Sequence, residues 1–353
     1  MLKIDQLLRI AVDKKASDLH LMVGVPPVVR INGKLEKLDM DPLGNPDTFS
    51  LTEELMDARR KEIFRTNGEV DFSHTIGNLC SFRVNVYKQS GSVAAVIRII
   101  PSVIPTIEQL HLPKVLQKFA LLPRGLVLVT GPTGSGKSTT LAAMINYINH
   151  NCSCHIITLE DPIEYRHSHL NSIINQREIE TDTLSFGNGL RAALREDPDV
   201  ILVGEMRDVE TIATAITAAE TGHLVLATLH TSDAAQTINR IIDVFPEHQQ
   251  EQIRTQLAGT LQGIVAQILL PTKNEAGRTG AYEILVATPA LRNLIREGKI
   301  HQIPSYIQTG GQFGMISMDA ALGKLVKMGI VDMESAQGRC TDQQIFEKYA
   351  LGM

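Results

Sequence analysis

The strongest constraint on the fold is Gly131–Thr139, which reads Gly-Pro-Thr-Gly-Ser-Gly-Lys-Ser-Thr. The aliphatic run Leu126–Thr130 precedes it and is typical of a buried strand, whereas Thr140–Ile148 follows with apolar residues at helical spacing. A strand, a glycine-rich loop ending in Lys-Ser, and a helix together make a phosphate-binding loop in its confirming context. Strands and helices alternate from there on, so the chain is predicted to be an α/β protein with a mostly parallel sheet.

The residues of this loop supply different parts of a site for ATP. Its glycines allow backbone angles and close approaches that side chains would block, so that N–H groups converge on an anion at the helix N-terminus. Lys137 can reach the β- and γ-phosphates, and the Ser138 hydroxyl can ligate Mg²⁺. The candidate ATP-binding residues are Gly131, Pro132, Thr133, Gly134, Ser135, Gly136, Lys137, Ser138 and Thr139.

The length, net charge and apolar runs of the chain limit the kinds of protein it can be. With 353 residues it is long enough for two domains, and its formal net charge of −5 argues against a nucleic-acid partner. No apolar run approaches the roughly 18 residues that span a bilayer, and the first residues do not lead into a signal peptide. We therefore expect a cytoplasmic protein with no transmembrane segment, able to dock on a membrane complex.

The cysteines Cys80, Cys152, Cys154 and Cys340 form no C-x-x-C pair. This spacing disfavours a four-cysteine zinc site and favours free buried thiols in a reducing compartment.

The domain organisation follows from one proline-rich stretch. Before it, the sequence reads as a small α/β domain with a mixed sheet and one or two helices, one of them over Ser50–Arg65. Pro101–Pro105 then ends the last strand of this domain, because two prolines in five residues cannot continue a sheet. The predicted domains are residues 1–101 and 113–353, with a linker at 102–112 and a helical C-terminal part from about 288.

Acidic residues follow the second strand of the larger domain, His155–Leu159. Glu160, Asp161 and Glu164 come at its carboxyl end, where open α/β sheets place their ligand chemistry. We expect a role for Glu164 in binding Mg²⁺ or positioning water. The alternative is an acidic turn closed by Pro162.

Glu205 is the candidate catalytic base. The buried run Val200–Val203 ends in Gly204-Glu205, whereas the common nucleotide motif ends in an aspartate that supports Mg²⁺. A carboxylate at this point can orient and deprotonate the attacking water. The metal must then rely on Ser138, phosphate oxygens, waters and Glu164.

Two histidines, His223 and His230, bracket another core strand. Their position suits a sensor of the γ-phosphate, although one histidine beside a strand is more often structural. Beyond residue 236 the chain is predicted to be mainly helical, apart from an edge strand at Arg278–Val286.

Four motifs resemble those of the secretion ATPase superfamily, and the resemblance covers nearly the whole chain. Gly131–Thr139 resembles its Walker A box and Leu159–Tyr165 its Asp box. Asp197–Asp208 resembles its atypical Walker B box, and Gly222–Thr231 its His box. The helix Ala290–Glu297 is similar to a signature of the type IV pilus retraction ATPases, and the four-cysteine insert typical of extension and type II enzymes is missing.

The resemblance implies a PAS-like N-terminal domain, a RecA-like ATPase domain and a homohexamer. It implies a Mg²⁺-ATP-driven retraction motor at the inner face of the cytoplasmic membrane, acting on an inner-membrane pilus platform protein. It also implies that Arg83 and Arg98 complete the nucleotide site, whereas the pattern alone allows them to be merely solvated. The alternatives are an extension or accessory ATPase, or a nucleotide-gated assembly protein without motor activity.

The polar face of the helix 290–297 carries Arg292, Asn293, Arg296 and Glu297. Because exposed substitutions usually change stability by only about 0.5 kcal/mol, replacing both arginines with alanine is expected to preserve folding and most ATPase activity. The same change is expected to stop retraction.

Overall fold

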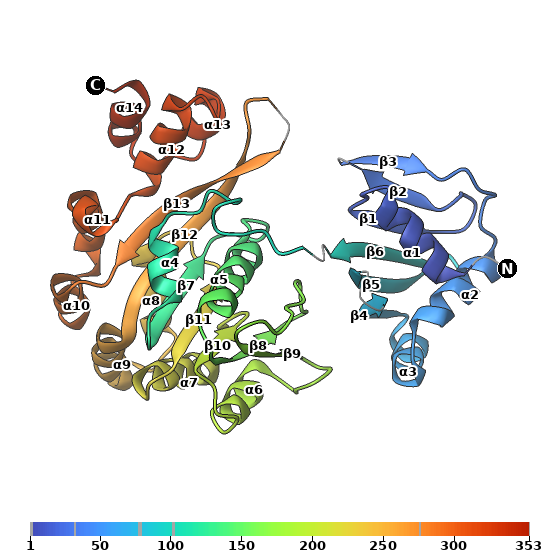
Figure 1. Cartoon of the computed structure of the whole chain (residues 1–353), viewed down its shortest axis with the longest axis horizontal. Helices are drawn as coiled ribbons and strands as arrows, with labels where there is room; N and C mark the ends of the chain where they lie inside the picture. The colour runs from blue at the N-terminus through green and yellow to red at the C-terminus, as the bar shows by residue number, and fades with distance from the viewer. Residues whose placement is uncertain (1–2, 32, 77–79, 101–102, 275–276, 353) are drawn as a thin grey trace. The chain divides into compact units, whose positions relative to one another are not determined.

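The computed structural model describes residues 3–31, 33–76, 80–100, 103–274 and 277–352. The chain divides into two compact units, each built around its own sheet (Figure 1). The first unit comprises Met1–Val103 with Pro162–Arg166, and the second comprises Ile104–Asp161 with His167–Met353.

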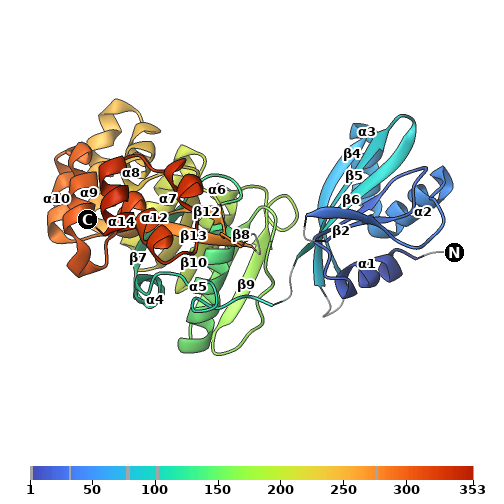
Figure 2. The same ribbon diagram turned by 90° about the horizontal axis from the view of Figure 1, so that it is seen from above.

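The first unit contains a six-stranded sheet in the order β3-β2-β1-β6-β5-β4. Its strands are β1 (Asp18–Leu21), β2 (Val28–Ile31), β3 (Lys34–Lys37), β4 (Glu69–Ile76), β5 (Cys80–Gln89) and β6 (Ser92–Ile100). Every described pairing is antiparallel, so the predicted mixed sheet is wrong. The helices α1 (Ile4–Asp13) and α2 (Asn45–Leu55) lie on the same side of this sheet and share its hydrophobic core (Figure 2).

A third helix, α3 (Ala58–Asn67), corrects the single helix predicted over Ser50–Arg65. The chain breaks after α2 because Asp57 takes an extended conformation and its carboxylate accepts the N–H of Arg60 at 2.8 Å. This contact caps the N-terminus of a new helix.

The second unit contains a seven-stranded sheet in the order β13-β12-β7-β11-β10-β8-β9. Its strands are β7 (Gly125–Thr130), β8 (His155–Glu160), β9 (Ile173–Glu178), β10 (Val200–Val203), β11 (Leu224–Leu229), β12 (Leu261–Pro271) and β13 (Arg278–Val286). All pairings are parallel except that of β12 with β13, so the predicted mostly parallel sheet and edge strand are confirmed.

Helices cover both faces of this sheet. Core residues of α4 (Val115–Ala120) and α5 (Lys137–Asn151) pack on one face. Those of α6 (Phe186–Ala193), α7 (Val209–Glu220), α8 (Ala234–Asp243) and α9 (Glu247–Thr260) pack on the other. Strands buried on both faces read as continuous apolar runs, which is why β7, β10 and β11 were visible in the sequence.

The C-terminal part is helical, with a small core shared with β12 and β13 (Figure 1). Its elements are α10 (Pro289–Arg296), η1 (Ile300–Gln302), α11 (Ile303–Thr309), η2 (Gly311–Phe313), α12 (Met318–Lys327), α13 (Met333–Gln337) and α14 (Gln343–Leu351). In the described ranges, no helix is both long enough and apolar enough to cross a bilayer. Cys152, Cys154 and Cys340 are free thiols, as expected, but they are half-buried rather than buried.

Two strands of the second sheet, β9 and β12, are not predicted by the sequence patterns. The mainly helical character predicted beyond residue 236 is wrong for β12, which lies between β7 and β13. Its residues Ile264, Val265 and Ala266 are all fully buried, so the strand shows no alternation of polar and apolar residues. A short apolar run cannot be assigned to strand or helix by periodicity, and here the sheet decided it.

Candidate nucleotide-binding and catalytic site

The glycine-rich loop leaves the carboxyl end of β7, and α5 begins at Lys137. Gly131 has a φ of +142°, and a Cβ there would lie 2.2 Å from the main-chain oxygen of Gln267. No residue with a side chain fits at that distance. Gly136 caps α5 in a left-handed conformation with a φ of 89°. The loop is therefore shaped by its own glycines and by close packing against β12.

The Lys137 side chain folds back across the loop. Its Nζ donates to the carbonyl oxygens of Gly131 at 2.8 Å and Pro132 at 3.2 Å. These contacts place the ammonium group at the start of a helix whose first N–H groups have no helical partner, which is where an anion is stabilised.

The carboxyl ends of the central strands bring the other predicted groups to the same edge of the sheet. Val203 of β10 pairs with Leu159 of β8 and Ala227 of β11, and Leu229 of β11 pairs with Thr130 of β7. The residues that follow these strands, including Glu205 and His230, therefore lie at the same edge as the loop.

Glu205 is held by two cationic or potentially cationic groups. Its Oε2 lies 2.6 Å from an Arg207 nitrogen, and its Oε1 lies 3.1 Å from Nε2 of His230. Burial raises the pKa of Glu205, but the hydrogen bonds and charges of Arg207 and His230 outweigh it, so the pKa is lowered from its usual value. The carboxylate is therefore ionised at neutral pH and can accept a hydrogen bond from water.

Gly204 stands where the common nucleotide motif has an aspartate, and the packing around it explains the difference. A Cβ on Gly204 would lie 2.9 Å from the carbonyl oxygen of Leu159 on the neighbouring strand. The Gly204 N–H donates to that oxygen at 2.7 Å, and Thr228 Oγ1 donates to the Gly204 carbonyl. An aspartate cannot occupy this place without moving β8, so the carboxylate comes one residue later.

The predicted metal ligands fall in different units. Ser138 lies in the first turn of α5 in the second unit, whereas Glu164 is an exposed residue of Pro162–Arg166 in the first. The pairing of Ser138 with Glu164 around Mg²⁺ stays a prediction. Glu160, the first acidic residue after Thr158, accepts hydrogen bonds from Thr158 at 2.6 Å and Gln176 at 3.1 Å.

His223 does not lie beside the loop. It precedes β11, whose first residue Leu224 pairs with Gly125 at the amino end of β7, so the length of the strand separates it from Gly131. Its Nδ1 lies 2.9 Å from the carbonyl oxygen of Ala218, at the end of α7. The strand between the two histidines places His223 and His230 at opposite ends of β11, and the role of His223 in nucleotide binding stays a prediction.

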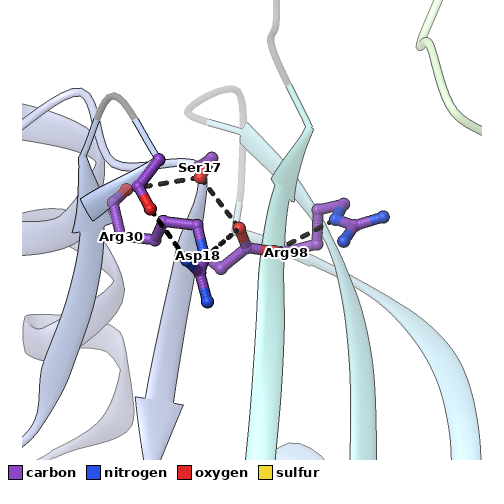
Figure 3. Close-up of polar contacts among 5 residues, drawn as sticks. Ser17, Asp18, Arg30 and Arg98 are labelled. Carbon is purple, nitrogen blue, oxygen red and sulfur yellow. Dashed lines mark hydrogen bonds and ion pairs between the residues drawn. The ribbon is translucent and has the colours of Figure 1, made fainter. Parts of the chain in front are cut away.

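Arg83 and Arg98 are neighbours across β5 and β6 in the first unit. Arg98 Nε donates to Asp18 Oδ1 at 3.0 Å, and Asp18 Oδ2 lies 3.7 Å from Arg30 Nε and accepts from Ser17 Oγ at 2.8 Å (Figure 3). Asp18 is only 6% exposed, whereas Arg98 keeps 67% of its side chain exposed. Both arginines are available to an anion, and their part in a nucleotide site stays a prediction.

Arg292 is not on a free face, which corrects one expectation. Its guanidinium donates to the carbonyl oxygens of Ala258 and Gly259 and, at 3.2 Å, to Gln262 Oε1. Burial is the main reason that the pKa of Arg292 is lowered. Arg292 thus joins α10 to the end of α9 and has a structural role.

We expect Arg292→Ala to lower the free energy of unfolding by about 1–3 kcal/mol, because carbonyl groups lose a charged donor. Arg296→Ala is the matched control. Its side chain is exposed and contacts Asn293 of the same helix, so a change within about 0.5 kcal/mol is expected. Urea unfolding measures both, and equal stability of the two variants would contradict the structural role. Any role of α10 in coupling is better tested with Arg296→Ala.

Sequence reasoning missed three residues that complete these sites. Arg207 and Asp18 hold predicted residues in place, and Gln267 lies buried against the loop. A polar residue alone in an apolar run, as Gln267 is in Ile264–Leu270, was the available signal.

The chain has extensive similarity to known proteins. The protein-family model described as "Type II/IV secretion system protein" matches residues 3–320. The type IV pilus retractation ATPase PilT of Pseudomonas aeruginosa is 48% identical over 334 residues, covering 95% of this chain and 97% of that protein. The twitching motility protein of Neisseria gonorrhoeae is 50% identical over 318 residues, covering 90% and 85%.

Solved structures of similar proteins superpose on nearly the whole of this chain. The crystal structure of the pilus retraction motor PilT with bound ADP superposes with a TM-score of 0.92 at 49% identity, covering 99% of this chain and 100% of that one. The ATPase DotB of Legionella pneumophila gives 0.79 at 28% identity, covering 95% and 94%. The predicted α/β architecture, an N-terminal domain followed by an ATPase domain, is confirmed. The chain belongs to the type II/IV secretion system protein family.

Proposed function

We propose that this protein hydrolyses ATP and uses the energy to retract type IV pili. The observation that carries the proposal is the meeting of an ionised Glu205, paired with His230, and a complete phosphate-binding loop at one edge of a parallel sheet. The chain also aligns along nearly its whole length with the retraction ATPase of Pseudomonas aeruginosa.

The roles of the residues follow from their places. Lys137 and the N–H groups of the loop bind the phosphates of ATP, and Glu205 orients the attacking water and accepts its proton. His230 contacts Glu205 and is placed to transmit the loss of the γ-phosphate to the segment after β11. The water oxygen forms a bond to the γ-phosphorus while the bond from that phosphorus to the β,γ-bridging oxygen breaks, and ADP leaves with the electron pair. The proton of the attacking water passes to a carboxylate oxygen of Glu205.

The loop also suits Mg²⁺. Ser138 has its hydroxyl in the first turn of α5, directly after the phosphate-binding Lys137. One hydroxyl beside the phosphates fits Mg²⁺, because this ion keeps several waters and binds through phosphate oxygens and one or two protein ligands. When bound, Mg²⁺ neutralises charge on the phosphates, and Ser138 with Glu164 would hold it.

We infer that the protein forms a homohexameric ring at the inner face of the cytoplasmic membrane and acts on a pilus platform protein. Arg83 and Arg98 would complete the nucleotide site, as exposed cations that are direct cross-strand partners on β5 and β6. The family resemblance supports this arrangement.

A second candidate is an accessory ATPase of the same machinery. The type IV pilus ATPase PilU of Pseudomonas aeruginosa is 42% identical over 335 residues, covering 95% of this chain and 88% of that protein.

Pilus number in a deletion strain separates these functions. Loss of a retraction motor is expected to leave excess surface pili and no twitching, and the wild-type gene should restore both. Bald cells would indicate an extension motor instead. A normal pilus number with weaker retraction would indicate the accessory role.

A further inference from the structure

The side chain of Gln267 is buried among apolar residues in the middle of β12. Only 1% of the residue is exposed, and its neighbours Val265 and Ala266 are fully buried. A buried amide costs free energy unless both its donor and its acceptor are satisfied, so the contacts of Gln267 reveal what the position requires.

Both ends of the amide are bonded to the phosphate-binding segment. Nε2 donates to the carbonyl oxygen of Ser135 at 2.7 Å, and Oε1 accepts from Thr140 Oγ1 at 2.9 Å. The Ser135 carbonyl can only accept, which fixes the orientation of the amide. One side chain thus ties the middle of the loop to the first turn of α5.

Gln267 also packs closely against two glycines of the loop. A Cβ on Gly131 would lie 2.2 Å from the main-chain oxygen of Gln267, and a Cβ on Gly136 would lie 3.3 Å from its side-chain Nε2. Strand β12 therefore touches the loop near its beginning and its end.

We propose that Gln267 is a positioning residue for nucleotide binding, which holds the phosphate-binding loop in the conformation that receives phosphate. The inference rests on the proposed ATPase function. Several glycines of the loop have positive φ, and such a backbone loses much conformational freedom when it is ordered. A side chain that orders the loop beforehand removes this cost from binding.

The test compares Gln267→Met with Gln267→Glu in the full-length protein. Methionine keeps the length of the side chain but forms neither hydrogen bond. Glutamate keeps the shape, but in its ionised form it cannot donate to the Ser135 carbonyl and adds negative charge beside the place of the phosphates. Because burial favours the protonated acid, this variant is measured at alkaline pH beside the wild type. The dissociation constant of ADP, measured by calorimetry, is expected to rise about tenfold for Gln267→Met and further for Gln267→Glu.

A kinetic measurement separates positioning from chemistry. The KM for ATP is expected to rise with the dissociation constant, whereas kcat should change less than about threefold, because Gln267 does not touch the reacting atoms. A fall in kcat at unchanged KM would overturn the proposal.

The matched control is Gln262→Met, on the same strand at its other end. Gln262 Nε2 donates to the carbonyl oxygen of Arg124 at 3.4 Å and its Oε1 accepts from Arg292 at 3.2 Å, and neither partner belongs to the phosphate-binding loop. The ADP affinity of Gln262→Met is expected to match that of the wild type. Thermal unfolding without nucleotide checks that Gln262→Met and Gln267→Met are both folded. An equal loss of affinity in both variants, or none in Gln267→Met, would overturn the proposal.

Thr140→Val tests the same contact from the helix. It should weaken ADP binding by about threefold and add little to the effect of Gln267→Met, because both changes remove one interaction. This variant decides the matter if Gln267→Met does not fold, since unchanged ADP affinity in Thr140→Val would overturn the proposal. If the wild type itself binds no ADP, the proposed function fails instead.

Discussion

Lys137→Ala is expected to abolish detectable binding of ADP and ATP while leaving the protein folded. The Lys137 ammonium lies over the loop on the carbonyl oxygens of Gly131 and Pro132, and alanine removes the only long cationic side chain within Gly131–Thr139. Without it, the phosphates meet only N–H dipoles. Calorimetry with ADP and with a non-hydrolysable ATP analogue measures the loss.

The matched control for this change is Lys118→Ala. Lys118 is an exposed residue of α4 in the same unit, and its loss should leave nucleotide affinity at the wild-type value. Affinity of Lys137→Ala within a few-fold of the wild type would remove the loop from the nucleotide site.

Glu205→Gln is expected to slow ATP hydrolysis by roughly 10²-fold or more, the scale for losing general-base assistance. Glutamine is nearly isosteric but cannot accept the proton of the attacking water. Because Glu205 is not part of the loop, ADP affinity should stay close to the wild-type value. Steady-state turnover and calorimetry measure the two quantities separately.

Glu210→Gln provides the control for the loss of one carboxylate charge. Glu210 pairs with Arg191 on the surface of the same unit and should keep wild-type turnover when changed. If Glu205→Gln also keeps turnover near the wild type, another carboxylate is the base, and Glu164→Gln becomes the next variant to measure.

Most of the site was predictable because its residues follow strongly apolar strands. The strands β7, β8, β10 and β11 carry short continuous runs of Val, Ile and Leu, and in a parallel sheet their carboxyl ends share one edge. The loop and Glu205 could be assigned from local order alone. His230 follows β11 and joins them at this edge, whereas His223 precedes β11 and therefore lies at the opposite end of the strand.

What the sequence determined by itself was local: the phosphate-binding loop, the strands that precede it and Glu205, and the alternation of strand and helix. Only the tertiary structure decided which distant residues support them. Gln267 is more than 100 residues from Thr140 in the chain, yet β12 pairs with β7 and brings the two side chains together. Arg292 lies among the polar residues of α10, and only its contacts with the end of α9 show that it donates to main-chain carbonyl groups. Periodicity reports whether a position faces water or core, whereas hydrogen-bond partners across a sheet depend on which strands lie side by side, and periodicity does not report that for strands far apart in the chain.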